Sequence, residues 1–166
     1  MIKYFLIGSI GGLLSGILGI GGGVVFVPLL TYLTKTDFKT NTGISSLAVV
    51  FVATGSSITY IINDFSSGTN FVFEIFIIII GGIIGGYFGS KLTVKINTQL
   101  LKKLFSILLI ASAYRIIFST TVTATYEDNL VLYFLIGLVS GIGSGLLGIG
   151  GGIIRIPMLI FFGGFE

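Results

Sequence analysis

The sequence predicts an all-α integral membrane protein with about five spanning segments, of which the first and the last are broken. Hydrophobic residues make up 54% and charged residues 9% of the 166 residues, whereas soluble domains carry roughly 25% charged residues. Residues 4–28 recur as residues 133–157 with 15 of 25 positions identical, so the chain contains an internal repeat. Each copy has a glycine triplet in an apolar stretch, Gly21-Gly22-Gly23 and Gly150-Gly151-Gly152, with a proline five residues later.

The first broken segment covers residues 3–33. A continuous helix of this length would exceed a hydrocarbon core of roughly 30 Å. Glycine weakens a helix and proline removes a backbone donor, so we expect the triplet to interrupt the helix at membrane depth. The predicted arrangement is a helix to about Leu18, an irregular turn, and a short helix from about Val24.

The remaining segments complete a first four-helix repeat in residues 1–129 and begin a second repeat in residues 130–166. The predicted spans after the first broken helix are residues 43–62, 71–90 and 100–118, and the second broken helix starts at residue 130. Ser45 and Ser46 lie in the hydroxyl-rich start of the second span, where we expect hydroxyls to cap the helix. The alternative is that they face a polar cavity and contact a substrate.

Two sets of glycines recur at four-residue spacing and predict faces for close helix packing. They are Gly8, Gly12 and Gly16 in the first segment, and Gly81, Gly85 and Gly89 in the third span.

The lysines predict the orientation in the membrane. Loops 34–41 and 91–103 hold six lysines, whereas loops 63–70 and 119–129 hold none, so the first pair should be cytoplasmic. If each segment crosses once, the amino terminus lies outside. If the first broken segment enters and returns, the amino terminus lies inside, and the sequence leaves both possibilities open.

The composition also excludes several classes of function. The chain has no cysteine and no histidine, so no nucleophile–base pair, thiolate metal site or disulfide can be assembled from them. We therefore expect neither an enzyme nor a bound cofactor or metal. The net charge of +3 comes from loop lysines, which indicates orientation in a lipid bilayer rather than affinity for nucleic acid.

The glycine motif and the start of the second span resemble the sulfite exporter TauE/SafE family of membrane transporters. The resemblance rests on Gly19-Ile20-Gly21-Gly22-Gly23 with Pro28, on the second copy of this motif, and on Gly43-Ile44-Ser45-Ser46-Leu47-Ala48. Ser45 stands where the family more usually has threonine. The resemblance implies a two-repeat transporter fold in the inner cell membrane and a permease or exporter for small anions, often sulfur-containing ones such as sulfite or organosulfonates.

The candidate substrate-binding residues follow from the helix breaks. An interrupted helix exposes backbone N–H groups at the start of the next helix, and these groups with the helix dipole attract anions. Arg155 replaces Phe26 in the second copy, and an arginine at that depth needs a carboxylate, a substrate or water. The candidates are Gly21, Gly22, Gly23, Gly150, Gly151, Gly152, Arg155, Ser45 and Ser46. The alternative roles are a packing kink for the triplets and snorkelling for Arg155.

Family members usually have two four-helix halves, so this chain resembles a truncated member that ends after the second broken segment. We expect that segment to lack its partner helices, so that its N–H groups would face lipid and the chain would be inactive or would work only as an assembly. A second copy, a complementing second-half chain, or collapse onto the first four helices would cover it. The alternative function is a non-transporting membrane assembly or interaction protein, which labelled-anion flux and co-purification would distinguish from a transporter.

Overall fold

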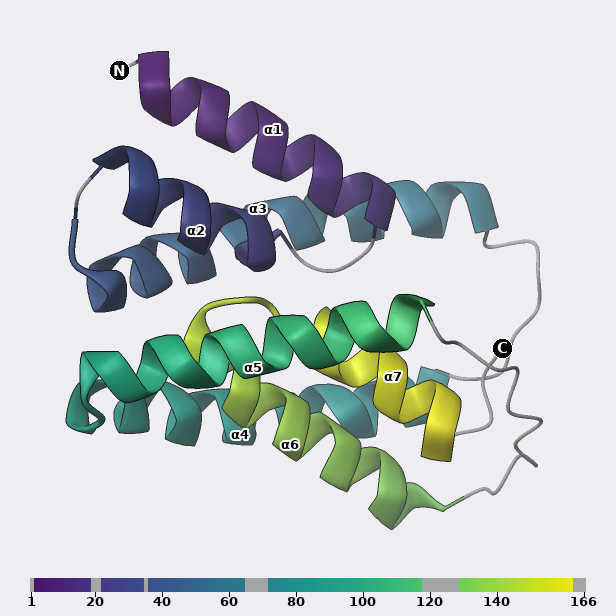
Figure 1. The fold of residues 1–166 in the computed structure, drawn as a ribbon. Coiled ribbons are helices and arrows are strands. Elements are labelled where there is room, and N and C mark those ends of the chain that lie inside the picture. The colour runs from purple at the N-terminus through teal and green to yellow at the C-terminus, as the bar shows by residue number, and fades with distance from the viewer. Residues whose placement is uncertain (1, 19–21, 35, 65–71, 118–128, 163–166) are drawn as a thin grey trace.

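The computed structural model describes residues 2–18, 22–34, 36–64, 72–117 and 129–162 (Figure 1). These residues form seven helices: α1 (Ile2–Leu18), α2 (Gly23–Thr34), α3 (Phe38–Asp64), α4 (Val72–Lys95), α5 (Thr98–Ile117), α6 (Leu130–Leu147) and α7 (Gly152–Phe162). The described residues contain no strand, which confirms the predicted all-α class.

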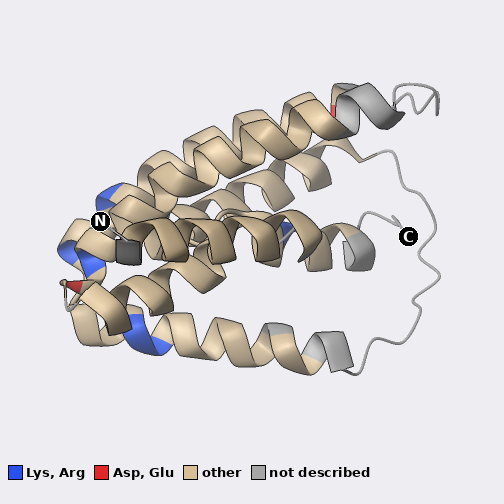
Figure 2. Ribbon diagram, turned by 90° about the horizontal axis from the view of Figure 1, so that it is seen from above, with Lys and Arg blue, Asp and Glu red and all other residues tan. Residues whose placement is uncertain are grey.

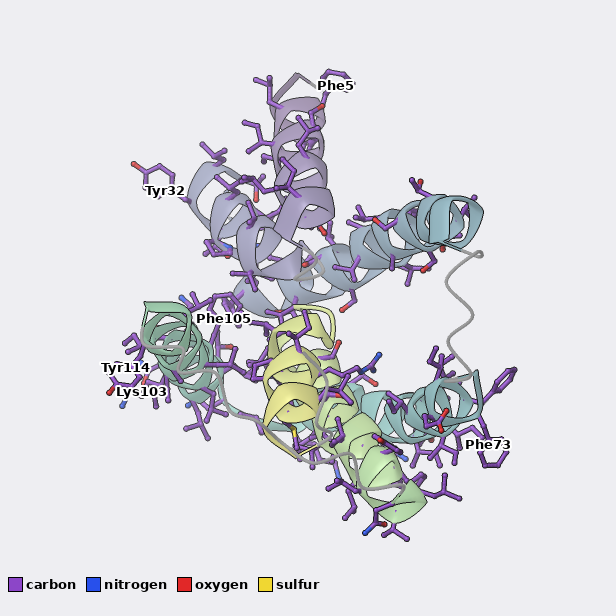
Figure 3. All side chains as sticks on the ribbon, turned by 90° about the vertical axis from the view of Figure 1, so that its right-hand side faces the viewer. Phe5, Tyr32, Phe73, Lys103, Phe105 and Tyr114 are labelled. Atoms are coloured by element: carbon purple, nitrogen blue, oxygen red, sulfur yellow. The ribbon has the colours of Figure 1, made fainter. Side chains whose placement is uncertain are left out.

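Three described helices are long and apolar enough to cross a membrane, at Phe38–Thr59, Phe73–Lys95 and Leu130–Leu147. Shorter apolar helices lie at Tyr4–Ile17 and Gly23–Thr34. The total number of spans therefore stays a prediction. Large aromatic side chains point outward from the bundle, among them Phe5, Tyr32, Phe73 and Tyr114 (Figure 3). An apolar surface of this kind suits contact with lipid rather than with water.

Both copies of the repeat are broken at equivalent residues. Helix α1 ends at Leu18 and α6 at Leu147, while α2 begins at Gly23 and α7 at Gly152, each pair separated by the repeat interval of 129. The backbone φ angle is 66° at Gly148 and 69° at Gly150, in the left-handed region that favours glycine. The predicted breaks in the first and last segments are thus confirmed.

The two broken segments enter the bundle from opposite ends. Helix α1 begins at the end where the lysines gather and α2 returns to that end, so the first segment is a re-entrant pair (Figures 1 and 2). Helices α6 and α7 make the same reversal from the other end (Figure 1). Of the two possibilities that the sequence left open, the structure therefore shows the re-entrant one, because each break reverses the chain (Figure 1). The two copies form an inverted repeat, an arrangement found in many transporters.

Helices α4 and α6 pack backbone against backbone through glycine. A Cβ atom at Gly85 would overlap the Leu138 carbonyl oxygen, and one at Gly141 would overlap the Gly82 carbonyl oxygen. The same holds along the whole interface, which consists of Gly81, Gly85 and Gly89 on α4 and Gly137, Gly141 and Gly145 on α6. The glycine face predicted in the third span is therefore a packing face.

The equivalent face of α1 is open. A Cβ atom at Gly8, Gly12 or Gly16 would meet nothing within 4 Å outside the backbone of α1 itself. Within the described part of the chain, the packing predicted for these three glycines is not observed. Neighbouring Gly11, by contrast, lies against the ring of Phe26 on α2.

The second broken segment is covered by helices of the first repeat. Ile149 is 0% exposed, and it belongs to an apolar cluster with residues of α2, α3, α5, α6 and α7. The cluster contains Val27, Phe38, Leu101, Phe105, Leu147, Ile149 and Ile153. Of the three ways in which this break was expected to be covered, the described residues show collapse onto the first four helices. The rings of Phe38 and Phe105 meet edge to face in this cluster, with centroids 5.9 Å apart.

Helix α3 begins at Phe38, so the hydroxyl-rich stretch lies inside the helix rather than at its cap. The Thr42 hydroxyl donates to the Phe38 carbonyl over 2.9 Å, and the Ser46 hydroxyl donates to the Thr42 carbonyl over 2.9 Å. Such bonds to the preceding turn let hydroxyl side chains sit within a helix. The capping role predicted for Ser45 and Ser46 is therefore wrong, and Asp37 accepts from the Lys39 N–H at the actual start.

The orientation can be tested with single cysteines, since the chain has none of its own. Lys95 lies at the lysine-bearing end of α4, and we expect Lys95→Cys to resist impermeant thiol reagents in intact cells. An epitope added before Met1 should be protected equally, because α1 starts at the same end (Figure 1). Thr123→Cys, which lies outside the described residues, should label. Labelling of Lys95→Cys with protection of Thr123→Cys would reject this orientation.

Candidate functional site

The two helix breaks meet inside the bundle. A Cβ atom at Gly23 would overlap the Gly148 carbonyl oxygen and would lie 2.6 Å from the carbonyl carbon of Ile149. Gly22, Gly23 and Gly150 are buried, while Gly151 and Gly152 are half-buried. The structure therefore places Gly23 of the first predicted triplet against Gly148 and Ile149, which directly precede the second triplet. Gly21 lies outside the described residues.

The carbonyl groups that end α6 are covered by hydroxyl groups of neighbouring helices. Ser45 on α3 donates to the Gly148 carbonyl over 2.7 Å. The Thr93 hydroxyl on α4 has one hydrogen to donate, and the carbonyl oxygens of Gly145 at 3.1 Å and Leu146 at 3.0 Å compete for it with that of Gly89 on its own helix at 3.0 Å. Carbonyl groups at a helix end carry partial negative charge. Hydroxyl groups of α3 and α4 thus lie against the negative side of the second break, and Ser45 bonds the Gly148 carbonyl there.

The N–H groups that open α7 are not satisfied in this way. The Gly151 carbonyl accepts from the N–H of Ile154 over 3.2 Å and from that of Arg155 over 2.8 Å. The N–H groups of Gly152 and Ile153 precede these bonds, so neither has a partner within its own helix. The Gly22 carbonyl makes the equivalent bonds at the start of α2, to Val25 and Phe26. Each break therefore presents the positive end of a short helix.

Arg155 adds a full positive charge beside the second break. Its Nε donates to the Ser140 hydroxyl of α6 over 3.3 Å. Its Nη2 lies 3.1 Å from the position of a Cβ on Gly82 and 3.2 Å from that of a Cβ on Gly151. Among the described residues Arg155 forms no ion pair with a carboxylate, although it is half-buried. A positive site of this kind attracts anions.

Of the two predicted serines, Ser45 lies at the second break, whereas Ser46 does not contact it. The Ser45 hydroxyl is 0% exposed and holds the Gly148 carbonyl, so it positions the break. Ser46 is exposed on α3 and bonds its own helix. The described residues include no group of three His, Cys, Asp or Glu side chains that could hold a metal ion.

Sequence reasoning missed two residues of this site, Ser140 and Thr93. Ser140 could have been found, because it replaces Gly11 between the two copies just as Arg155 replaces Phe26. Both changes fall in one repeat and create one hydrogen bond. Thr93 gives no signal in the sequence, since its carbonyl partners lie 52 and 53 residues away.

Comparison with known proteins identifies transporters as relatives. The family described as "Sulfite exporter TauE/SafE" matches residues 1–116. A probable membrane transporter protein of Methanocaldococcus jannaschii is 37% identical over 162 residues, which cover 93% of this chain and 59% of that protein. The probable membrane transporter protein YunE of Bacillus subtilis is 26% identical, with 94% of this chain and 66% of that protein covered. No solved structure matches the chain.

The match also extends to MamO of Magnetospirillum gryphiswaldense, named a probable membrane transporter protein. It is 31% identical over 110 residues, which cover 64% of this chain and 17% of that protein. This chain spans about 59% of the length of the first relative above.

Proposed function

Because this chain belongs to the sulfite exporter TauE/SafE family, one of membrane transporters rather than of enzymes, we propose that it moves small anions across the membrane. The family's description names sulfite, and the proposed substrates are sulfur-containing anions, namely sulfite or an organosulfonate. The proposed location is the inner cell membrane, which the chain crosses several times with its lysine-bearing end in the cytoplasm.

The observation that carries this proposal is that the carbonyl groups and the N–H groups at the second break differ in their hydrogen bonds. The Ser45 hydroxyl donates to the Gly148 carbonyl and the Thr93 hydroxyl lies against the Gly145 and Leu146 carbonyls, and carbonyl groups of this kind bind cations in discontinuous helices. Among the described residues, the first N–H groups of α7 have no partner within their own helix, and the Arg155 guanidinium is held by the Ser140 hydroxyl at Nε alone. An anion is therefore the ligand that this arrangement favours.

The proposed contacts come from both repeats. Glycines at the two breaks let an anion approach the backbone closely, and those of the second triplet lie directly before or at the start of α7. We assign Gly22, Gly23, Gly150, Gly151, Gly152 and Arg155 to substrate contact, together with Gly21 from the sequence pattern. Ser45 supports the site through the Gly148 carbonyl rather than by touching the substrate. Nothing in the contacts of Ser46 favours a role.

A second function, helix binding, is favoured by one observation. Gly8, Gly12 and Gly16 on α1 correspond to the glycines with which α6 packs on α4, yet no described residue of another helix comes within 4 Å of their Cβ positions. A partner helix with small residues would fit this face, whether in a second copy of this chain or in a complementing second-half chain.

The proposed transport is tested with the cysteine-free chain in proteoliposomes at low and high protein density. We expect saturable uptake of labelled sulfite at high density, where chains can assemble, and inhibition by methanesulfonate but not by choline. Binding of sulfite should be saturable at both densities. Absence of saturable binding and uptake at either density would overturn the proposal and leave helix binding as the better account.

A further inference from the structure

The two copies of the broken segment differ at one place where the structure gives the difference a chemical meaning. Three residues lie close together at each break, and each residue of the first copy corresponds to one of the second copy 129 positions later. In the first copy they are Gly11, Gly22 and Phe26, and in the second copy they are Ser140, Gly151 and Arg155. Only the middle position keeps its residue.

In the first copy, an aromatic ring fills the space between the helix and the break. Cβ atoms at Gly11 and Gly22 would both collide with the Phe26 ring, whose atoms are the nearest ones to each of these two positions. Phe26 is 3% exposed and packs in an apolar cluster with Ile7 and Leu30. This copy therefore closes its break with a neutral, apolar plug.

In the second copy, a guanidinium occupies the equivalent place. The Ser140 hydroxyl donates to the Gly137 carbonyl over 3.0 Å and accepts from Arg155 Nε over 3.3 Å, so its hydrogen is committed away from the arginine. Ser140 is 0% exposed. The hydrogen bond from Nε holds the guanidinium beside Gly82 and Gly151. Its Nη atoms donate to none of the described residues. A guanidinium offers paired donors in a planar fork, which suits two oxygens of one oxyanion.

We propose that Arg155, positioned by Ser140, is the single charged recognition element of the site, and that it binds one compact oxyanion group such as sulfite or an alkyl sulfonate. The first copy has the neutral Phe26 ring where the second has a guanidinium, so the site should bind a solute with one anionic group more tightly than one with two separated groups. A second separated charge would be desolvated with only the positive end of α2 to face and no charged side chain in the first copy's equivalent position. This inference rests on the proposed transport of anions, and it adds that the Arg155 guanidinium binds the charged group of the anion.

The internal repeat supplies the test, because the first copy already shows a neutral set that packs. The double variant Ser140→Gly with Arg155→Phe copies that set into the second copy. We expect it to remain folded in nanodiscs, with affinity for labelled sulfite reduced roughly 10- to 100-fold through loss of a charged hydrogen bond. Arg155→Lys keeps the charge without the fork and should fall between the two. If the double variant does not fold, Arg155→Gln serves instead, and we expect the same loss of affinity for labelled sulfite.

The matched control is Phe26→Leu, which alters the neutral plug of the first copy. It should lower the melting temperature while sulfite affinity stays within about twofold, since its charge pattern is unchanged. In competition, methanesulfonate should displace sulfite, whereas ethanedisulfonate should be roughly 10-fold weaker or more.

The outcomes separate this inference from the transport proposal. If the parent chain binds no sulfite, both fail. If the parent chain binds sulfite and the Arg155 variants bind it equally well, anion transport stands and Arg155 is not the recognition element. Equal displacement by the mono- and disulfonate would overturn the single-charge assignment.

Discussion

Replacing Gly141 with alanine is expected to lower the melting temperature of this chain in nanodiscs by roughly 2–12 °C. A Cβ at Gly141 would overlap the Gly82 carbonyl oxygen and lie 2.9 Å from the Gly82 Cα. These are backbone atoms, which cannot rotate aside as a side chain can. Helices α4 and α6 must therefore separate along their glycine interface, and overpacking of this kind typically costs about 1–3 kcal/mol, occasionally more.

The matched control is Gly12→Ala, because Gly12 is the residue of the first copy that corresponds to Gly141. A Cβ at Gly12 would meet nothing within 4 Å, so the melting temperature should hold or rise slightly from better helix propensity, worth up to about 1 kcal/mol. Thermal unfolding followed by circular dichroism measures both variants. Equal melting temperatures for the two would show that the α4–α6 interface is not as close as described.

Replacing Gly23 with alanine is expected to reduce sulfite affinity by about 100-fold, because it forces the two helix breaks apart. The added methyl would overlap the Gly148 carbonyl oxygen and contact the Ile149 backbone. Any shift of Gly148 also disturbs its bond from Ser45, which spans 2.7 Å. The start of α7 and the guanidinium of Arg155 would then lose their common geometry.

The control for this variant is Gly43→Ala on α3, where a Cβ meets nothing within 4 Å. It should bind labelled sulfite like the parent chain. A Gly23→Ala chain that binds sulfite with parental affinity would show that the meeting of the breaks does not form the site.

Much of the local structure follows from the sequence. Glycine triplets followed by Pro28 and Pro157 weaken the helix through backbone entropy and a missing donor, and these effects need no tertiary contact. The helix ends at Leu18 and Leu147 accordingly lie where the pattern placed them. The start of α3 could not be predicted as well, because hydroxyls at Thr42 and Ser46 bond the preceding turn as readily as they cap a helix.

The candidate site was predictable in its parts but not in its assembly. The triplets and Arg155 stand out in the sequence, since glycine runs and a charge are unusual in apolar segments. That Ser45 would hold a carbonyl 103 residues away depends on how α3 crosses the second break. The reversal of direction at each break likewise depends on which helices pack around it, and the sequence left it open.

The two glycine faces show a difference that the sequence could not predict. Gly8, Gly12 and Gly16 match Gly137, Gly141 and Gly145 residue for residue, so local sequence gives both faces the same prediction. The sequence by itself determined the two-copy plan, the helix breaks and the capacity of both faces for close packing. Only the tertiary structure decided that the face of α6 is covered and that the face of α1 meets none of the described residues. The physical reason is that α4 has one such glycine face, Gly81, Gly85 and Gly89, and α6 already occupies it.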